Sequence, residues 1–298
     1  MDKLVEREAV ARSPMATAPA IAVQFFLIPL LVVGATVLVY VGFRSLLSED
    51  RSAEEYLTDI RSGGSNRRWP AAYELSRLMA DPAFVKREEA VLAPELTKAF
   101  AESTNDDPRV RQYLALTLGR LTPPIPAEAR QLLIGALNDQ DSQTRISAIW
   151  ALGSTGDASA AGDIEGQYRS DDAGVRKMAV YALGSLPAPA GDDTLVKALG
   201  DSQPDVQWNA AIGLARHGRH EGVPVLRRML DRSYVERNVT RQAQPRADVD
   251  AVGEVMISGL RAIAALKEST LSEQVKTLST GDHSLKVRQA AIETLKNL

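Results

Sequence analysis

The sequence predicts an all-α protein, in which a single transmembrane helix precedes an α-solenoid of about seven two-helix repeats. Two observations lead to this fold class. A long uncharged apolar run lies near the N-terminus, and a ten-residue pattern with apolar residues at helical spacing recurs through the rest of the chain. The predicted segments are an N-terminal tail at 1–19, the transmembrane helix at 20–47 and the repeats at 52–298.

The apolar run contains no charged residue from Ser13 to Phe43, and its most apolar part, Ala20 to Phe43, is 24 residues long. A helix needs about 20 mainly apolar residues to cross a bilayer core. A buried core helix and a cleavable signal peptide are the alternatives. The run is longer than a signal-peptide core, and no A-x-A-like cleavage site follows it. The predicted membrane anchor includes Phe25, Phe26, Pro29, Gly34 and Gly42.

Charges that flank this run set the expected orientation. Lys3, Arg7 and Arg12 precede it, and Arg44 and Arg51 follow it closely. The positive-inside rule therefore places the N-terminus in the cytoplasm and the repeats on the outer, periplasmic face.

The repeat reads V-R-x-x-A-x-x-A-L-G, and its clearest copies begin at Thr144 and Val175. A second amphipathic stretch, such as 130–137, precedes each copy, so each unit is expected to contain two helices. Glycines and acidic residues mark the turns between them. The second residue of the pattern, which we call the marker, falls at Arg68, Arg111, Arg145, Arg176, Gln207, Gly259 and Arg288.

This pattern resembles the HEAT repeat, in the short bacterial form related to phycocyanobilin-lyase-type repeats. The resemblance covers roughly residues 52–298 and is most specific at 90–216 and 270–298. It implies an α-solenoid whose second helices line an extended concave face.

Acidic residues stand before the marker arginines, and we expect them to cap the second helix and to pair with its arginine. This interpretation makes the series a structural ladder, whereas the alternative is a row of arginines that binds phosphate or nucleic acid. The ladder residues are Arg111, Arg145, Arg176, Arg288, Asp107, Asp141 and Asp172.

Aromatic residues gather at two positions, one and five residues after the marker, which are adjacent on a helix. All three tryptophans of the chain fall there. Such a stripe is suited to binding a peptide or a partner helix, although the same side chains could instead fill the space between the helices of each unit. The candidate partner-binding residues of this stripe are Trp69, Tyr73, Leu116, Trp150, Tyr181 and Trp208.

An insertion at about 231–248 lacks apolar periodicity and is rich in arginine. Tyr234, Arg237 and Arg241 are further candidates for partner binding. A solvated, partly disordered loop is the alternative.

Composition excludes several kinds of chemistry. The 298 residues include no cysteine and three histidines, and 35 basic against 38 acidic residues give a net charge of −3. Disulfides and thiol nucleophiles are impossible, and binding driven by nucleic-acid phosphates is disfavoured. One His-Glu pair, His220-Glu221, falls short of the three ligands that a catalytic metal site generally needs.

We therefore predict no catalytic residue, metal or cofactor. The expected function is that of a non-catalytic adaptor that binds proteins in or at the membrane, contacts the bilayer through 20–47 and belongs to a larger complex. The alternatives are an enzyme of the HEAT-like lyase or metal-dependent hydroxylase type, and phosphate or nucleic-acid binding through the arginines.

Overall fold

The computed structural model describes residues 28–47, 51–239 and 250–298, and these residues form two compact units, Met1–Ser52 and Ala53–Leu298. The described residues are helical or irregular and contain no strand. The predicted tail at 1–19, Phe25, Phe26, Arg241 and the last part of the predicted insertion lie outside the described residues.

The first unit contains one described helix, α2 (Ile28–Leu47). In the part of the chain that the structure describes, no helix is both long and apolar enough to cross a membrane. The first part of the expected span, residues 20–27, lies outside the described residues. Within α2 the first charged residue is Arg44.

The predicted membrane localisation, with a bilayer contact at 20–47 and the repeats on the outer face, is therefore corrected. Pro29 lies in the first turn of α2. A Cβ added at Gly34 or Gly42 would meet no other atom within 4 Å, so neither glycine marks a close helix contact here.

In the described parts of the second unit, 53–239 and 250–298, seven helix pairs follow one another, and one further helix lies between the two members of the sixth pair. The first helices are α3 (Ala53–Ser62), α5 (Pro82–Glu102), α7 (Ala127–Ala136), α9 (Ala161–Gln167), α11 (Asp192–Ala198), α13 (Val223–Met229) and α16 (Ser272–Gly281). The second helices are α4 (Ser65–Leu78), α6 (Pro108–Leu118), α8 (Ser142–Ser154), α10 (Ala173–Leu183), α12 (Pro204–Arg216), α15 (Ala251–Leu266) and α17 (Leu285–Leu295).

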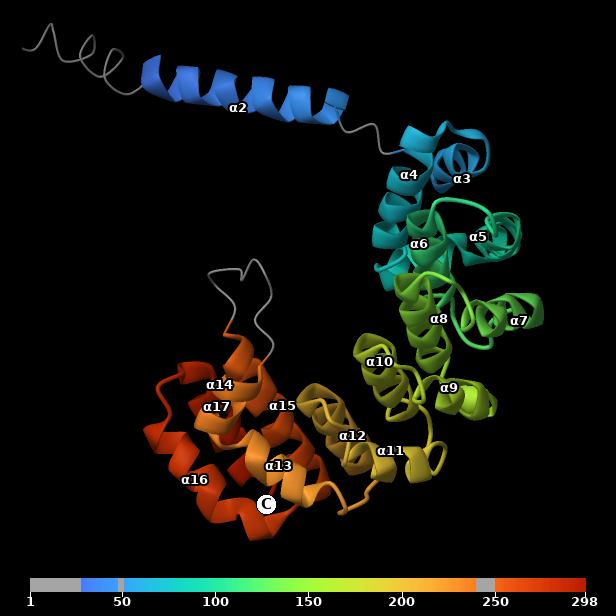
Figure 1. Ribbon diagram of the computed structural model, residues 1–298. Coiled ribbons are helices and arrows are strands. Elements are labelled where there is room, and N and C mark those ends of the chain that lie inside the picture. The colour runs from blue at the N-terminus through green and yellow to red at the C-terminus, as the bar shows by residue number, and fades with distance from the viewer. Residues whose placement is uncertain (1–27, 48–50, 240–249) are drawn as a thin grey trace, which may run out of the picture. The chain divides into compact units, whose positions relative to one another are not determined.

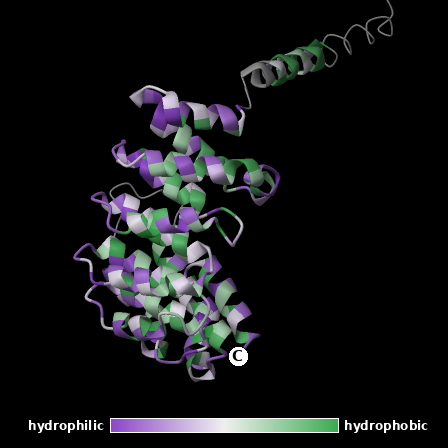
Figure 2. Cartoon of the chain, turned by 90° about the vertical axis from the view of Figure 1, so that its right-hand side faces the viewer, coloured by the Kyte–Doolittle hydropathy of each residue, from purple (hydrophilic) through white to green (hydrophobic). Residues whose placement is uncertain are grey.

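The second helices pack against one another in chain order, from α4 through α17, and each also packs against the first helix of its own pair. Figure 1 shows α4, α6, α8, α10 and α12 on the inner side of a curved row, with α5, α7 and α9 on its outer side. The hydrophilic turns lie along the edge of this unit in Figure 2, while apolar residues concentrate where helices meet. The predicted α-solenoid is confirmed.

Aspartates begin most second helices, as the sequence suggested. The side chains of Asp107, Asp141 and Asp172 accept hydrogen bonds from backbone N–H groups in the first turns of α6, α8 and α10. Each satisfies a donor that has no partner inside the helix and contributes about 1 kcal/mol. Asp250 caps α15 in the same way.

Small residues set the spacing between second helices. A Cβ at Gly184 would lie 2.5 Å from the Cα of Gly213, and one at Gly153 would lie 2.7 Å from the Cβ of Ala182. Both distances are too short for non-bonded atoms. The helices α8, α10 and α12 therefore approach so closely that only glycine fits at these contacts. Repeated leucines, such as Leu114 and Leu183, fill the core beside them and are fully buried.

The predicted insertion does not begin as a loop. Residues Arg232–Asn238 form a seven-residue helix, α14, which is capped by Asp231 and buries Val235. Helix α14 packs against α13 and α15, so this part of the insertion belongs to the folded repeats.

Candidate functional site

Marker side chains bind the turn that precedes their own helix. The guanidinium groups of Arg145, Arg176 and Arg288 donate to the carbonyl oxygens of the residues six positions earlier, at 2.8, 2.9 and 3.1 Å. Gln207 makes the same bond from its amide, at 2.6 Å. One local bond thus recurs in four repeats and fixes the turn between the two helices of each pair.

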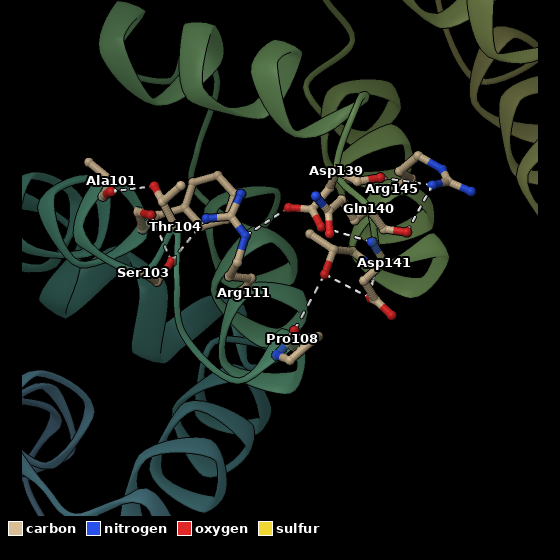
Figure 3. A network of polar contacts seen from close by, with 11 residues as sticks. Ala101, Ser103, Thr104, Pro108, Arg111, Asp139, Gln140, Asp141 and Arg145 are labelled. Atoms are coloured by element: carbon tan, nitrogen blue, oxygen red, sulfur yellow. Dashed lines mark hydrogen bonds and ion pairs between the residues drawn. The ribbon is translucent and has the colours of Figure 1, made fainter.

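Marker arginines also reach forward to the next repeat. Arg111 on α6 donates to the Asp139 carboxylate at 2.8 Å, as Figure 3 shows. Arg176 on α10 donates to both carboxylate oxygens of Asp201, at 3.0 and 3.2 Å. Each aspartate precedes the second helix of the following pair, so these ion pairs join consecutive repeats.

The ladder thus differs in detail from the expected one. Asp107, Asp141 and Asp172 cap helices, while other carboxylates bind the arginines. Arg145 has no carboxylate within 4.0 Å among the described side chains, because the position that would supply it is Ser170. The observed partners, Asp139 and Asp201, each stand six residues before the marker of the next repeat. A search of the sequence for aspartates at that position would have identified them.

The carboxylates Asp201 and Asp282 are both buried. Burial alone would raise the pKa of Asp201, but the hydrogen bonds from Arg176 and from the Gln203 backbone outweigh it, so this pKa lies below its ordinary value. The pKa of Asp282 also lies below its ordinary value, because hydrogen bonds from Arg232 and from the Ser284 backbone outweigh the effect of burial.

Arg232 was not among the predicted ladder residues. It lies on α14 and donates to Asp282 at 3.0 and 2.7 Å. It takes the place of a marker arginine, which α15 lacks because its marker is Gly259.

The aromatic stripe lies on the inner helices, but its members differ in accessibility. Tyr73 and Tyr181 are 38% and 40% exposed. Trp69, Leu116 and Trp150 are half-buried. Trp208 is buried, with 5% exposure, and packs in the core shared with α13 and α15, so a partner cannot reach it in this conformation.

Arginines lie over the faces of the accessible aromatic rings. Each guanidinium carbon lies within 6.0 Å of a ring centre, a geometry in which the cation is attracted to the ring. The pairs are Arg77 over Tyr73 at 6.0 Å, Arg109 over Trp69 at 4.5 Å, Arg120 over Trp150 at 5.8 Å and Arg216 over Tyr181 at 6.0 Å. These arginines were not predicted, because the stripe was read only at two positions of each helix.

Arg120 illustrates how the row is held together. Its guanidinium donates to the Ser76 carbonyl of α4 while it covers the Trp150 ring on α8, so it connects three second helices. Burial lowers the pKa of Arg120.

Two hollows open along the second helices. A hollow of about 310 Å³ lies between α10, α12 and α15, and a hollow of about 580 Å³ lies between α15 and α17. The first hollow is continuous with the stripe, because Tyr181 lines it.

Tyr234 and Arg237 lie on α14. The Tyr234 ring lies under Arg228, with 5.6 Å between the ring centre and the guanidinium carbon, and Arg237 is exposed. Tyr234 packs against the same apolar cluster as the buried stripe residue Trp208.

The histidines that might have ligated a metal have other partners. Both ring nitrogens of His217 lie against oxygens, the Asp192 carboxylate at 2.6 Å and the Leu186 carbonyl at 2.9 Å. His220 is paired with Glu268 at 2.7 Å. Within residues 28–47, 51–239 and 250–298, no group of three or more potential ligands could hold a metal ion.

Solved structures with a similar arrangement include natural and designed repeat proteins. An engineered protein is 21% identical, with 83% of this chain and 96% of that chain covered and a TM-score of 0.44. A designed armadillo repeat protein in complex with the peptide (KR)4 is 13% identical, with 83% and 99% covered and a TM-score of 0.44. An archaeal HEAT-like repeats protein from Thermococcus onnurineus NA1 is 13% identical, with 83% and 97% covered and a TM-score of 0.42.

Curated proteins give no match to this sequence. The family model for HEAT repeats matches residues 93–174 and 163–243, which together span just over half of the chain. This model describes HEAT repeats in general, so the finer resemblance to lyase-type repeats is not shown. The helix pairs, the marker positions and the family match agree, and the chain belongs to the HEAT repeat family.

Proposed function

We propose that this protein is a non-catalytic scaffold that binds a segment of another protein along the inner face of its second helices, as a subunit of a larger complex. HEAT repeats commonly form extended surfaces of this kind. The observation that carries the proposal is the row of accessible aromatic side chains on α4, α8 and α10, each covered by an arginine.

Aromatic and arginine side chains are the residues that most often dominate the energy of protein interfaces. In this row they are already ordered, because Arg120 is bound to Ser76 and the Tyr73 ring packs edge-on against Tyr113 with 5.2 Å between the ring centres. Side chains ordered before binding lose less conformational entropy when a partner arrives.

The geometry sets the length of the partner segment. Neighbouring packed helices lie about 8–10 Å apart, so the three steps from α4 to α10 span roughly 24–30 Å. An extended chain advances about 3.3 Å per residue, and a segment of about 7–9 residues would therefore cover the row.

The test compares co-purification of partners by the wild-type chain and by two variants. The double variant Tyr73→Ala/Tyr181→Ala removes exposed rings from the inner face, and Val91→Ser is the control. Val91 is 69% exposed on the outer helix α5. We expect a partner cross-linked to the wild-type chain to be lost from the double variant and kept by the control. Equal recovery by all three proteins would refute the proposal.

A further inference from the structure

The smaller of the two hollows has a chemical character that differs from the rest of the inner face. Its lining includes Tyr181, Asn209, Ile212, Arg216 and Arg261, and it contains no acidic residue. Two guanidinium groups from neighbouring helices, α12 and α15, thus border one small hollow without a carboxylate among them.

Neither arginine is neutralised within the described residues. Arg216 donates to the Ser185 hydroxyl at 3.5 Å and lies over the Tyr181 ring, but no described carboxylate lies within 4.0 Å of it. Arg261 is exposed and likewise makes no ion pair with a described residue, although Glu254 and Glu293 line the neighbouring hollow that it also borders.

Several other cations of the second helices are paired, although Arg145 is not. Arg176 is bound to Asp201, Lys177 is paired with Asp205 at 3.1 Å, and Arg77 is paired with Glu74 at 2.9 Å. The whole chain carries a net charge of −3, so free guanidinium groups in one hollow are not a consequence of a basic composition.

We propose that this hollow anchors an acidic side chain, Asp or Glu, of the partner segment, with an adjacent apolar residue against Tyr181 and Ile212. The proposal rests on the proposed function and specifies its partner. A carboxylate between two guanidinium groups receives charge-assisted hydrogen bonds from both, which are about twice as strong as neutral ones.

This assignment also says which end of the row receives the acidic residue of the partner segment. At the α4 end the equivalent cation, Arg77, already has its own carboxylate, so that end offers mainly aromatic surface. The acidic residue of the segment therefore lies over α10, α12 and α15, and its apolar remainder extends toward α4.

The test selects binders from a displayed library of random dodecapeptides on three forms of the full chain. These are the wild type, Arg216→Gln/Arg261→Gln and the control Arg87→Gln, whose arginine lies exposed on the outer helix α5. We expect peptides selected on the wild type and on the control to share an Asp or Glu at one position, and peptides selected on the double variant to lack it.

Affinities of one selected peptide then complete the test. Replacing its shared acid by Gln or Asn should weaken binding to the wild type at least roughly tenfold, as expected when a charged hydrogen bond is lost. The same replacement should have little effect on binding to the double variant, because the two changes remove the same interaction.

The possible outcomes separate this inference from the proposed function. Peptides that need Tyr73 and Tyr181 but show no acid preference would overturn the acidic subsite and leave the scaffold function standing. An acid preference that survives in the double variant would also overturn the subsite. If no selected peptide depends on the inner face, both proposals fall.

Discussion

The ion pair between Arg176 and Asp201 offers the sharpest test of how the repeats are held together. The two side chains are 15% and 6% exposed, and they connect α10 to the turn before α12. We expect Arg176→Met to destabilise the protein, because it leaves the buried Asp201 carboxylate without its cation.

The magnitude follows from burial and from the remaining hydrogen bonds. Removing one partner of a buried ion pair costs about 3–5 kcal/mol. Asp201 keeps a hydrogen bond from the Gln203 backbone at 2.9 Å, so we expect the lower end, ~3 kcal/mol. For a repeat unit of this size, such a loss lowers the melting temperature by roughly 6–12 °C.

The measurement is thermal and urea unfolding followed by circular dichroism, with Arg77→Met as the matched control. The pair between Arg77 and Glu74 has a similar length, 2.9 Å, but its side chains are 62% and 40% exposed. Exposed pairs contribute only about 0.2–1 kcal/mol. Hydrogen exchange of 173–183 and 204–216 adds a local readout, since solenoids can unfold repeat by repeat.

Equal destabilisation by the two Met substitutions would refute the reasoning, because burial would then make no difference. A loss of stability in Arg176→Met without faster exchange in α12 would show that the ion pair does not couple neighbouring repeats.

Three further predictions concern the repeat unit. Because the pKa values of Asp201 and Asp282 are lowered in the folded protein, both carboxylates stabilise the fold above about pH 4 and lose this contribution as the pH falls through their folded pKa values. In the variant Asp201→Asn/Asp282→Asn, the free energy of unfolding should therefore fall less steeply as the pH is lowered below about 4. Gly184→Ala should destabilise by about 1–3 kcal/mol because its Cβ would strike α12, whereas Gly135→Ala, with nothing within 4 Å, should be neutral or stabilising in the same urea titration. Asp141→Ala should cost about 1 kcal/mol through the loss of the α8 cap, and an unchanged urea midpoint would contradict that role.

The repeat architecture could be predicted because it depends on local, periodic features. Apolar residues at helical spacing and a recurring Val-Arg pair predict two helices per unit, and aspartates before the second helix predict its start. Each of these signals acts within one repeat, so a single sequence reveals it.

Interactions between repeats were harder to predict. Arg176 pairs with Asp201, 25 residues ahead, rather than with the nearer Asp172, because the stacking of the helices decides which carboxylate it can reach. Trp208 and Trp69 both stand one residue after the marker, but Trp208 is buried because α13 and α15 cover its side of α12. Whether a side chain at that position is buried depends on the neighbouring helices, and helical spacing alone does not supply that information.

The apolar run near the N-terminus shows a different limit. Its composition predicted a helix that crosses a membrane, whereas no helix among the described residues is both long and apolar enough to do so. Hydropathy indicates which residues are apolar, but it does not by itself fix the structure that they adopt.

The forward ion pairs make the junctions between consecutive repeats chemically alike. A complete unit supplies an arginine to its successor and an aspartate to its predecessor, as the unit of α5 and α6 does through Arg111 with Asp139 and Asp106 with Arg68. A copy of that unit would carry both halves of this junction and could fit between its neighbours without a compensating change. Other units are incomplete, because Ser170 and Gln207 stand where an aspartate and an arginine would be needed. The unit with Gly259 also lacks the arginine, and there Arg232 from helix α14 makes the junction instead.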